Sequence, residues 1–130
     1  MSSKEAYLET APVVVAPDGL TVRPLLETDR GSLAEFRLAA GLIGRTVRHR
    51  TIEEIWHVTE GAGAVWREGL SGGAPLNLAP GSAFVVPPGV AFQVRAGESD
   101  LVVIATTMPP WPGEDEVEVL EGVGPWMPTL

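Results

Sequence analysis

Residues 48–66, RHRTIEEIWHVTEGAGAVW, contain most of the side chains in this sequence that could carry chemistry. They include both histidines of the chain, His49 and His57, and the carboxylate of Glu54, five residues after His49. An imidazole and a carboxylate together can bind a divalent metal ion or transfer protons. Two histidines supply few nitrogens for a metal ion, so the direction of each side chain decides which chemistry is available.

By strand alternation, Glu54 and Trp56 share one face of their strand, while His57 points to the other. The same rule places Arg45, Val47 and His49 together on an earlier strand.

The composition excludes several other classes of protein. A chain of 130 residues, 45% of them hydrophobic, can form one domain with its own core. The absence of cysteine excludes disulfides, thiolate ligands and thiol nucleophiles and suits a reducing interior. A net charge of −8 argues against nucleic acid as a partner. No apolar segment approaches the roughly 20 residues that span a bilayer, and no secretion signal is evident. We therefore expect a cytoplasmic protein that does not interact with membranes.

Glycine and proline divide the chain into short segments rich in Val, Ile, Thr and aromatic residues, which predict strands. The segment 32–40, SLAEFRLAA, has the helix propensity of Ala and Leu, but its neighbours favour a strand. The predicted strands are residues 12–16, 20–26, 32–40, 45–50, 53–60, 63–69, 75–79, 83–87, 91–96 and 100–108. Short strands joined by tight turns, with few or no helices, predict an all-β antiparallel sandwich or barrel.

The whole chain, residues 1–130, is expected to be a single domain with its core at about 30–108. Residues 109–130 differ in character, because they contain five of the twelve prolines, two of the four tryptophans, and no Lys or Arg. Their acidic residues are interpreted as a solvated face. Because Trp111 and Trp126 need apolar surroundings, we interpret this segment as an extended arm on its own barrel or on a second subunit. Solvated disorder is the competing interpretation.

Two segments, HRTIEEIWHVTEGAGAVW and PGSAFVVPPGVAFQV, resemble the two motifs of the small single-domain cupins. The family's first motif reads His-x-His, three or four residues, Glu, six residues, Gly, and Gly61 fits its last position. The second reads Pro-Gly, five residues, Pro-x-Gly, two residues, His. Its first four positions are occupied by Pro80, Gly81, Pro87 and Gly89. The resemblance covers about residues 30–108 and implies a jelly-roll barrel, the double-stranded β-helix, and a homodimer. Ile55 and Val103 are expected to face outward, in agreement with a dimer.

The resemblance also implies iron, manganese, nickel or zinc held inside the barrel by three histidines and the glutamate. Glu54 matches the glutamate and His49 the second histidine, whereas Val47 and Phe92 occupy the other two positions. An alternative alignment makes His49 the first histidine and Thr51 the second, with a shortened loop. Two donors would hold an ion weakly, so we expect no tightly bound metal. A metal ion at His49 and Glu54, completed by water or substrate atoms, stays the alternative.

A pocket with these walls would suit a small organic ligand, with a carboxylate or enolate near Arg45. The expected ligand-binding residues are Arg45, Val47, Trp56 and Phe92, and the expected catalytic residues are His49 and Glu54. A carboxylate beside an imidazole raises the histidine pKa, which predicts an acid/base pair for isomerase or cyclase chemistry. Three alternatives stay open: a purely structural His–Glu pair, a metal-dependent dioxygenase or sugar-phosphate isomerase-like enzyme, and a non-catalytic sensor or accessory domain.

Overall fold

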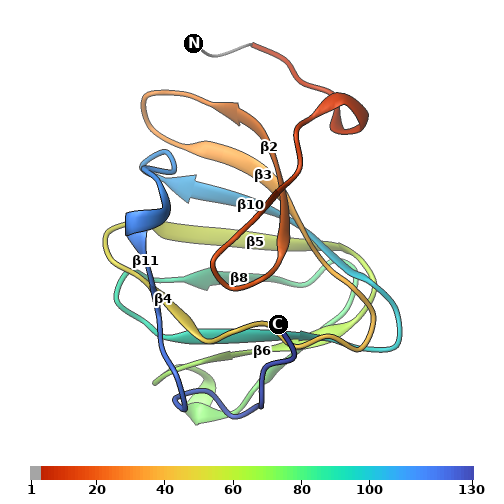
Figure 1. The fold of residues 1–130 in the computed structure, drawn as a ribbon, viewed down its shortest axis with the longest axis vertical. Helices are drawn as coiled ribbons and strands as arrows, with labels where there is room; N and C mark the ends of the chain where they lie inside the picture. Colours follow the sequence, from red (N-terminus) through yellow and green to blue (C-terminus); the bar gives the residue numbers. More distant parts are fainter. Residues whose placement is uncertain (1–3) are drawn as a thin grey trace.

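The structure, a computed structural model, describes residues 4–130 as two antiparallel sheets that face each other and form a barrel (Figure 1). One sheet has the strand order β1-β2-β3-β10-β5-β8, and the other β11-β4-β9-β6-β7. The strands are β1 Val14–Val15, β2 Thr21–Glu27, β3 Ser32–Leu38, β4 Val47–His49, β5 Glu53–Glu60, β6 Gly63–Arg67, β7 Leu76–Leu78, β8 Ala83–Val86, β9 Phe92–Ala96, β10 Leu101–Met108 and β11 Val117–Val119.

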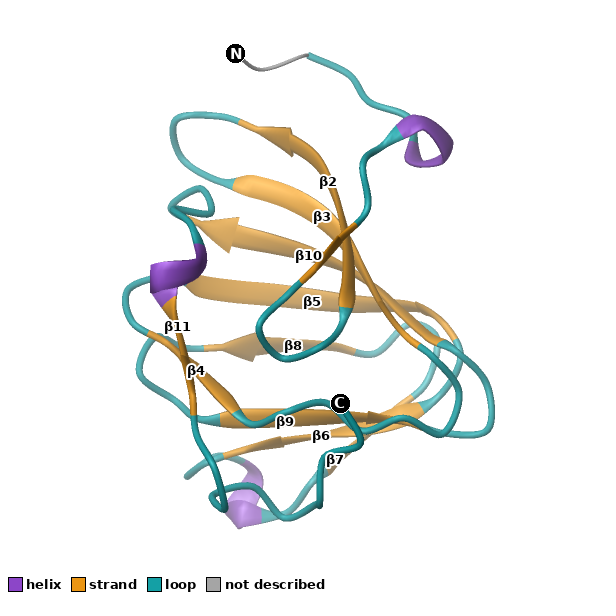
Figure 2. Cartoon of the chain, in the orientation of Figure 1, coloured by secondary structure: helices purple, strands orange, loops and turns teal. Residues whose placement is uncertain are grey.

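The described residues contain helical structure only as three single turns of 3₁₀ helix (Figure 2). These are η1 Leu8–Thr10, η2 Ser71–Gly73 and η3 Glu114–Glu116. The predicted all-β fold is therefore confirmed. Among residues 4–130, no helix is long and apolar enough to cross a membrane.

Each of the ten predicted strands has a counterpart in the structure, usually shorter by a few residues. Residues 32–38 form β3 despite their helix propensity, because they pair with β2 on one side and with β10 on the other. The sequence did not predict β11, which lies in the C-terminal arm. β11 pairs antiparallel with β4, with Val117 opposite His49, so the arm packs on its own barrel.

Strand β5 shows how alternation builds the core and the site together. Glu54, Trp56 and Val58 are buried, whereas Ile55 and His57 between them are exposed. The outward direction expected for His57 is confirmed. The inner face of β5 packs into an apolar cluster that includes Phe84 and Phe92, which hold the Trp56 ring at centroid distances of 5.3 and 5.9 Å. Glu54 therefore sits on a rigid strand in apolar surroundings.

The outward direction expected for Val103 is wrong. Val103 is 1% exposed and lies between Phe36 of β3 and Val58 of β5 in the pairing register. A continuous apolar run such as residues 101–105 of β10 does not reveal which of its residues face inward, and a register shift falls at Val102/Val103. Ile55 is exposed as expected, at 45%. The homodimer stays a prediction.

Gly61 illustrates why the first motif ends in glycine. It turns the chain from β5 into β6 with φ +78°, a conformation that favours glycine. A Cβ atom at this position would lie 1.9 Å from the carbonyl oxygen of Asp100, at the start of β10. Any side chain would push the two strands apart, so Gly61 fixes the end of the strand that carries Glu54.

Candidate functional site

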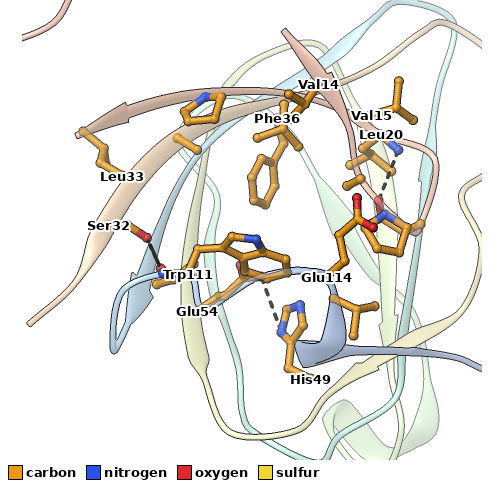
Figure 3. A pocket seen from close by; sticks show the side chains of 18 of the residues that line it. Val14, Val15, Leu20, Ser32, Leu33, Phe36, His49, Glu54, Trp111 and Glu114 are labelled. Carbon is orange, nitrogen blue, oxygen red and sulfur yellow. Dashed lines mark hydrogen bonds and ion pairs between the residues drawn. The ribbon is translucent and has the colours of Figure 1, made fainter. Parts of the chain in front are cut away.

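A pocket of about 530 Å³ opens between the two sheets, at the end of the barrel where the N-terminal segment and the C-terminal arm meet (Figure 3). Its walls come from residues 12–27, from β3, from the inner faces of β4 and β5, and from the arm. In Figure 3, Trp111 and Glu114 of the arm and Phe36 of β3 surround His49 and Glu54. The polar pair thus lies in a largely apolar cavity of the size that small-molecule sites have.

Five of the six residues that the sequence assigned to the site line this pocket. They are Val47, His49, Glu54, Trp56 and Phe92. Val47 and Phe92 are direct register partners of β4 and β9, and β5 contributes Glu54 and Trp56 from the opposite sheet. The barrel therefore brings together residues that are more than forty positions apart in the sequence.

The inward direction expected for Arg45 is wrong. Its side chain is exposed, and its Nε donates a hydrogen bond of 3.0 Å to the carbonyl oxygen of Leu130. Alternation fails here because β4 begins only at Val47, and the consecutive residues Thr46 and Val47 are both buried. Without Arg45, the expectation of a carboxylated ligand loses the cation on which it depended.

Sequence reasoning missed the parts of the site that lie outside the cupin-like motifs. Asp18 and Leu20, from the N-terminal segment, and Trp111 and Glu114, from the arm, all line the pocket. The Trp111 backbone N–H donates to Ser32 Oγ at 3.1 Å, which ties the arm to β3 (Figure 3). The one signal for these residues was the need of Trp111 for an apolar neighbour.

His49 and Glu54 form the polar centre of the site. His49 Nδ1 lies 3.7 Å from Glu54 Oε1, too far for a hydrogen bond, and both side chains are buried. Glu54 Oε1 accepts a hydrogen bond of 2.9 Å from Trp56 Nε1. His49 Nδ1 has no hydrogen-bond partner among the described residues. The His49 ring instead packs edge-on against Phe92 and Trp111, at centroid distances of 5.2 and 6.0 Å.

These surroundings shift the pKa values of His49 and Glu54 so that both side chains favour their neutral forms over an ion pair. Burial raises the pKa of Glu54 to about 8; the hydrogen bond from Trp56 opposes this rise, and the charges of Asp18 and Glu116 add to it. Burial lowers the pKa of His49 to about 4, although the charge of Glu116 acts in the opposite direction. The expected rise of the histidine pKa is therefore wrong, because desolvation outweighs the nearby carboxylate. At neutral pH, Glu54 holds a proton and His49 does not.

A second buried carboxylate, Glu116, connects the arm to the loop between His49 and Glu54. Its Oε2 accepts hydrogen bonds from the Thr51 and Ile52 backbone N–H groups at 2.6 and 2.9 Å, and its Oε1 accepts one from Thr51 Oγ1. Burial raises the pKa of this carboxyl, but these hydrogen bonds and the nearby His49 outweigh it and lower the pKa below its ordinary value. Glu116 is thus a charged structural anchor for the site.

The donors present do not fit the metal set that the cupin resemblance implies. Within residues 4–130, no group of three or more His, Cys, Asp or Glu side chains is arranged to hold a metal ion. Val47 and Phe92 stand side by side where the family has histidines, and Glu54 Oε1 already accepts a hydrogen bond from Trp56. One imidazole and one carboxyl fall short of the three protein ligands that catalytic metal sites typically use.

Comparisons with known proteins identify the fold. No family model matches the sequence, and no curated protein matches it. Among solved structures, KdgF from Halomonas sp. has a TM-score of 0.73 at 23% identity, with 85% of this chain and 96% of that chain covered. An RmlC-like cupin from Shewanella frigidimarina has a TM-score of 0.69 at 21% identity, covering 83% and 93%. Streptomyces Pac13, determined with uridine, has a TM-score of 0.73 at 10% identity, covering 92% of each chain. The chain has the cupin fold, a double-stranded β-helix, as its motifs predicted.

Proposed function

We propose that this cupin-fold chain binds a small organic molecule in the barrel pocket and acts on it by proton transfer, without a tightly bound metal ion. Glu54 is the acid and His49 the base. The observation that supports this most is the pair itself: a buried carboxyl with a pKa of about 8 beside a buried imidazole with a pKa of about 4, both in the pocket wall.

The chemistry open to such a pair is the transfer of a proton between two atoms of one ligand. An isomerisation or cyclisation of a carbonyl compound needs a base that removes a proton and an acid that supplies one elsewhere. Unprotonated His49 and protonated Glu54 offer both functions at neutral pH. Proton transfer by a positioned group contributes typically about 10²- to 10⁴-fold to the rate. The rigid strands β4 and β5 hold the two groups in place.

The similar structures give this proposal a precedent on the same barrel. Pac13 is described as a nucleoside dehydratase, and it was determined with uridine. Removal of water from an organic molecule also needs an acid and a base, so it belongs to the same class of chemistry. At 10% identity the likeness concerns the fold, and the nucleoside is not carried over to this chain.

Elemental analysis tests the absence of a tightly bound metal. Protein purified without chelator is compared with the His49→Ala/Glu54→Ala double variant. We expect background iron, manganese, nickel and zinc in both samples. About one equivalent of metal per chain in the wild type, with none in the double variant, would contradict the proposal and favour a metal-dependent enzyme.

A ligand screen tests the binding and the proton transfer. Carbonyl metabolites are screened in chelator for a rise in Tm, since a ligand that binds only the folded state stabilises it. Each hit is then followed by NMR for conversion, with the wild type, Glu54→Gln and His49→Gln. We expect both variants to bind the hit and to lose conversion. His57→Gln is the matched control, because this second histidine is exposed on the outer face of β5. Binding without conversion in the wild type would instead support a sensor or accessory domain.

A further inference from the structure

The charges in the pocket lining are of one sign. Among residues 4–130, four carboxyl side chains line it, those of Asp18, Glu27, Glu54 and Glu114, and no Lys or Arg does. Glu27 and Glu114 are exposed, Asp18 is partly buried, and Glu54 is buried. Because burial favours the neutral form of Glu54, the other three carboxyls are the ones that can attract a cation.

The arginines closest to His49 in the sequence do not compensate these charges, and Arg23 and Arg30, which lie near lining residues of β2 and β3 in the sequence, do not line the pocket either. Arg45 is turned to the carbonyl oxygen of Leu130. Arg48 and Arg50 form ion pairs with Glu118 of the arm, at 3.1 and 3.8 Å. None of the three lines the pocket. A ligand with a carboxylate or phosphate would therefore lose its hydration beside like charges and gain no cation in return.

The remaining walls offer aromatic rings to a ligand. Phe36, Trp56, Phe92 and Trp111 line the pocket. Trp111, 39% exposed, belongs to the arm and packs edge-on against His49. Ring faces attract cations, and this attraction is strongest for tryptophan and where water is excluded. Such walls accept an apolar body and tolerate a positive charge.

A second observation, independent of the acidic residues, indicates a wall built for a ligand. His49 is 4% exposed, and its ring projects from β4 into the pocket (Figure 3). Its Nδ1 has no hydrogen-bond partner among the described residues. A buried polar atom without a partner lowers the stability of the fold, so its presence calls for an explanation, and a bound ligand that completes its hydrogen bonding is one.

We propose that the ligand is an organic cation, an aromatic or aliphatic body that carries a protonated amine. The amine lies toward the carboxylates of Asp18, Glu114 and Glu27, and the body lies among the aromatic side chains. This inference rests on the proposed function, because it names the class of molecule that the same pocket takes. It replaces the carboxylated ligand expected from the sequence.

The test uses sets of matched probes. Each set consists of three compounds that share one aromatic or aliphatic body and differ only in the attached group, which is a primary amine, a primary amide or a carboxylic acid. The bodies of the different sets cover sizes that fit a pocket of about 530 Å³. Binding to the full chain is measured by calorimetry in chelator at pH 7.5. This pH lies above the pKa of Asp18, which burial raises to about 6. We expect the amine to bind at least about tenfold more tightly than the acid, with the amide between them.

Two variants test whether the preference for the amine over the acid arises from carboxylates that line the pocket. In Asp18→Asn/Glu114→Gln we expect the amine-to-acid ratio to fall about tenfold or more, while the amide affinity changes little. Asn at position 18 can still accept the hydrogen bond from the Leu20 N–H. Asp115→Asn is the matched control, since it removes one charge from the same turn as Glu114 but does not line the pocket. We expect it to keep the wild-type ratio.

The outcomes separate the two proposals. If the acid binds as tightly as the amine, or if the ratio is unchanged in the double variant, the cation specificity is overturned while the pocket remains a binding site. If no probe of any set binds, the small-molecule function falls, and the cation specificity falls with it.

Discussion

Two buried glutamates in this barrel have pKa values that are shifted in opposite directions: that of Glu54 is raised and that of Glu116 is lowered. Glu54, on β5 at the pocket wall, accepts one hydrogen bond, from Trp56 Nε1, and its pKa rises to about 8. Glu116, in the arm, accepts hydrogen bonds from the backbone and hydroxyl of Thr51 and from the backbone of Ile52, and its pKa is lowered. Both side chains are shielded from solvent, at 1% and 5% exposure, but Glu54 lies deeper in the barrel than Glu116.

The difference teaches that the number of donors and the depth of burial together decide what a shielded carboxyl does. Three donors stabilise the charged form, so Glu116 is suited to hold two segments together. One donor in apolar surroundings leaves the neutral acid favoured, so Glu54 is suited to give up a proton to a ligand. Structural and chemical roles thus separate within one site.

Removal of Glu116 should have the largest effect. Glu116→Ala leaves the buried Ile52 N–H without an acceptor and removes two charge-assisted hydrogen bonds from the exposed Thr51, and we expect it to lower the free energy of unfolding by about 3–4 kcal/mol. Urea unfolding measures this loss. Glu118→Ala is the control on the same arm, because its pairs with Arg48 and Arg50 are partly exposed and should contribute about 1 kcal/mol or less. Equal losses in the two variants would contradict the anchor role.

The pH dependence of stability tests the neutral form of Glu54. Folded Glu54 keeps its proton up to about pH 8, whereas the unfolded carboxyl, with an ordinary pKa of 4.5, releases it, so stability falls as pH rises between these values. For His49, with a pKa lowered from 6.5 to about 4, stability falls as pH decreases through that range. The two effects oppose each other between pH 4.5 and 6.5.

Above pH 6.5 only the effect of Glu54 remains. We expect the free energy of unfolding to fall by about 2 kcal/mol from pH 6.5 to 8, at about 1.4 kcal/mol per pH unit. Glu54→Gln, which cannot ionise, should show much less of this fall. Urea unfolding at several pH values gives both curves. Parallel curves for the wild type and the variant would refute a raised pKa for Glu54.

The smallest of the three effects concerns the single donor of Glu54. Trp56→Phe removes the Nε1 hydrogen bond, which favours the charged form, so the pKa of Glu54 should rise further. We expect a stability loss of about 1–2 kcal/mol from the lost hydrogen bond and the smaller ring. NMR titration of the Glu54 carboxyl carbon measures the pKa. A fall of this pKa in the variant would show that Trp56 does not act as its donor.

Much of the fold followed from the sequence because half-buried strands leave a local pattern. Alternation in residues 53–60 placed Glu54 and Trp56 inside and His57 outside, and turn residues marked the ends of the ten strands. Alternation failed at Val103, where five apolar residues followed by two consecutive threonines leave the phase open, and at Arg45, where the strand was shorter than its pattern.

The rest of the site depends on contacts that no local pattern records. Strand β11 exists because β4 and the anchor at Glu116 offer it partners, although its own sequence is short and acidic. The direction of the His49 pKa depends on how completely the surrounding walls exclude water. The N-terminal wall around Asp18 lies outside the cupin-like motifs, so no motif indicated that it lines the pocket.

Because Glu116 lies late in the sequence, the loop between His49 and Glu54 is completed late during synthesis. Ile52 and Glu116 are 64 residues apart in the sequence, so the loop between His49 and Glu54 leaves the ribosome long before its acceptor exists. At roughly 5–20 residues per second, the delay is about 3 to 13 s. During that interval the apolar inner faces of β4 and β5 lack their C-terminal cover, and a nascent chain halted before residue 116 would expose them to chaperones and proteases.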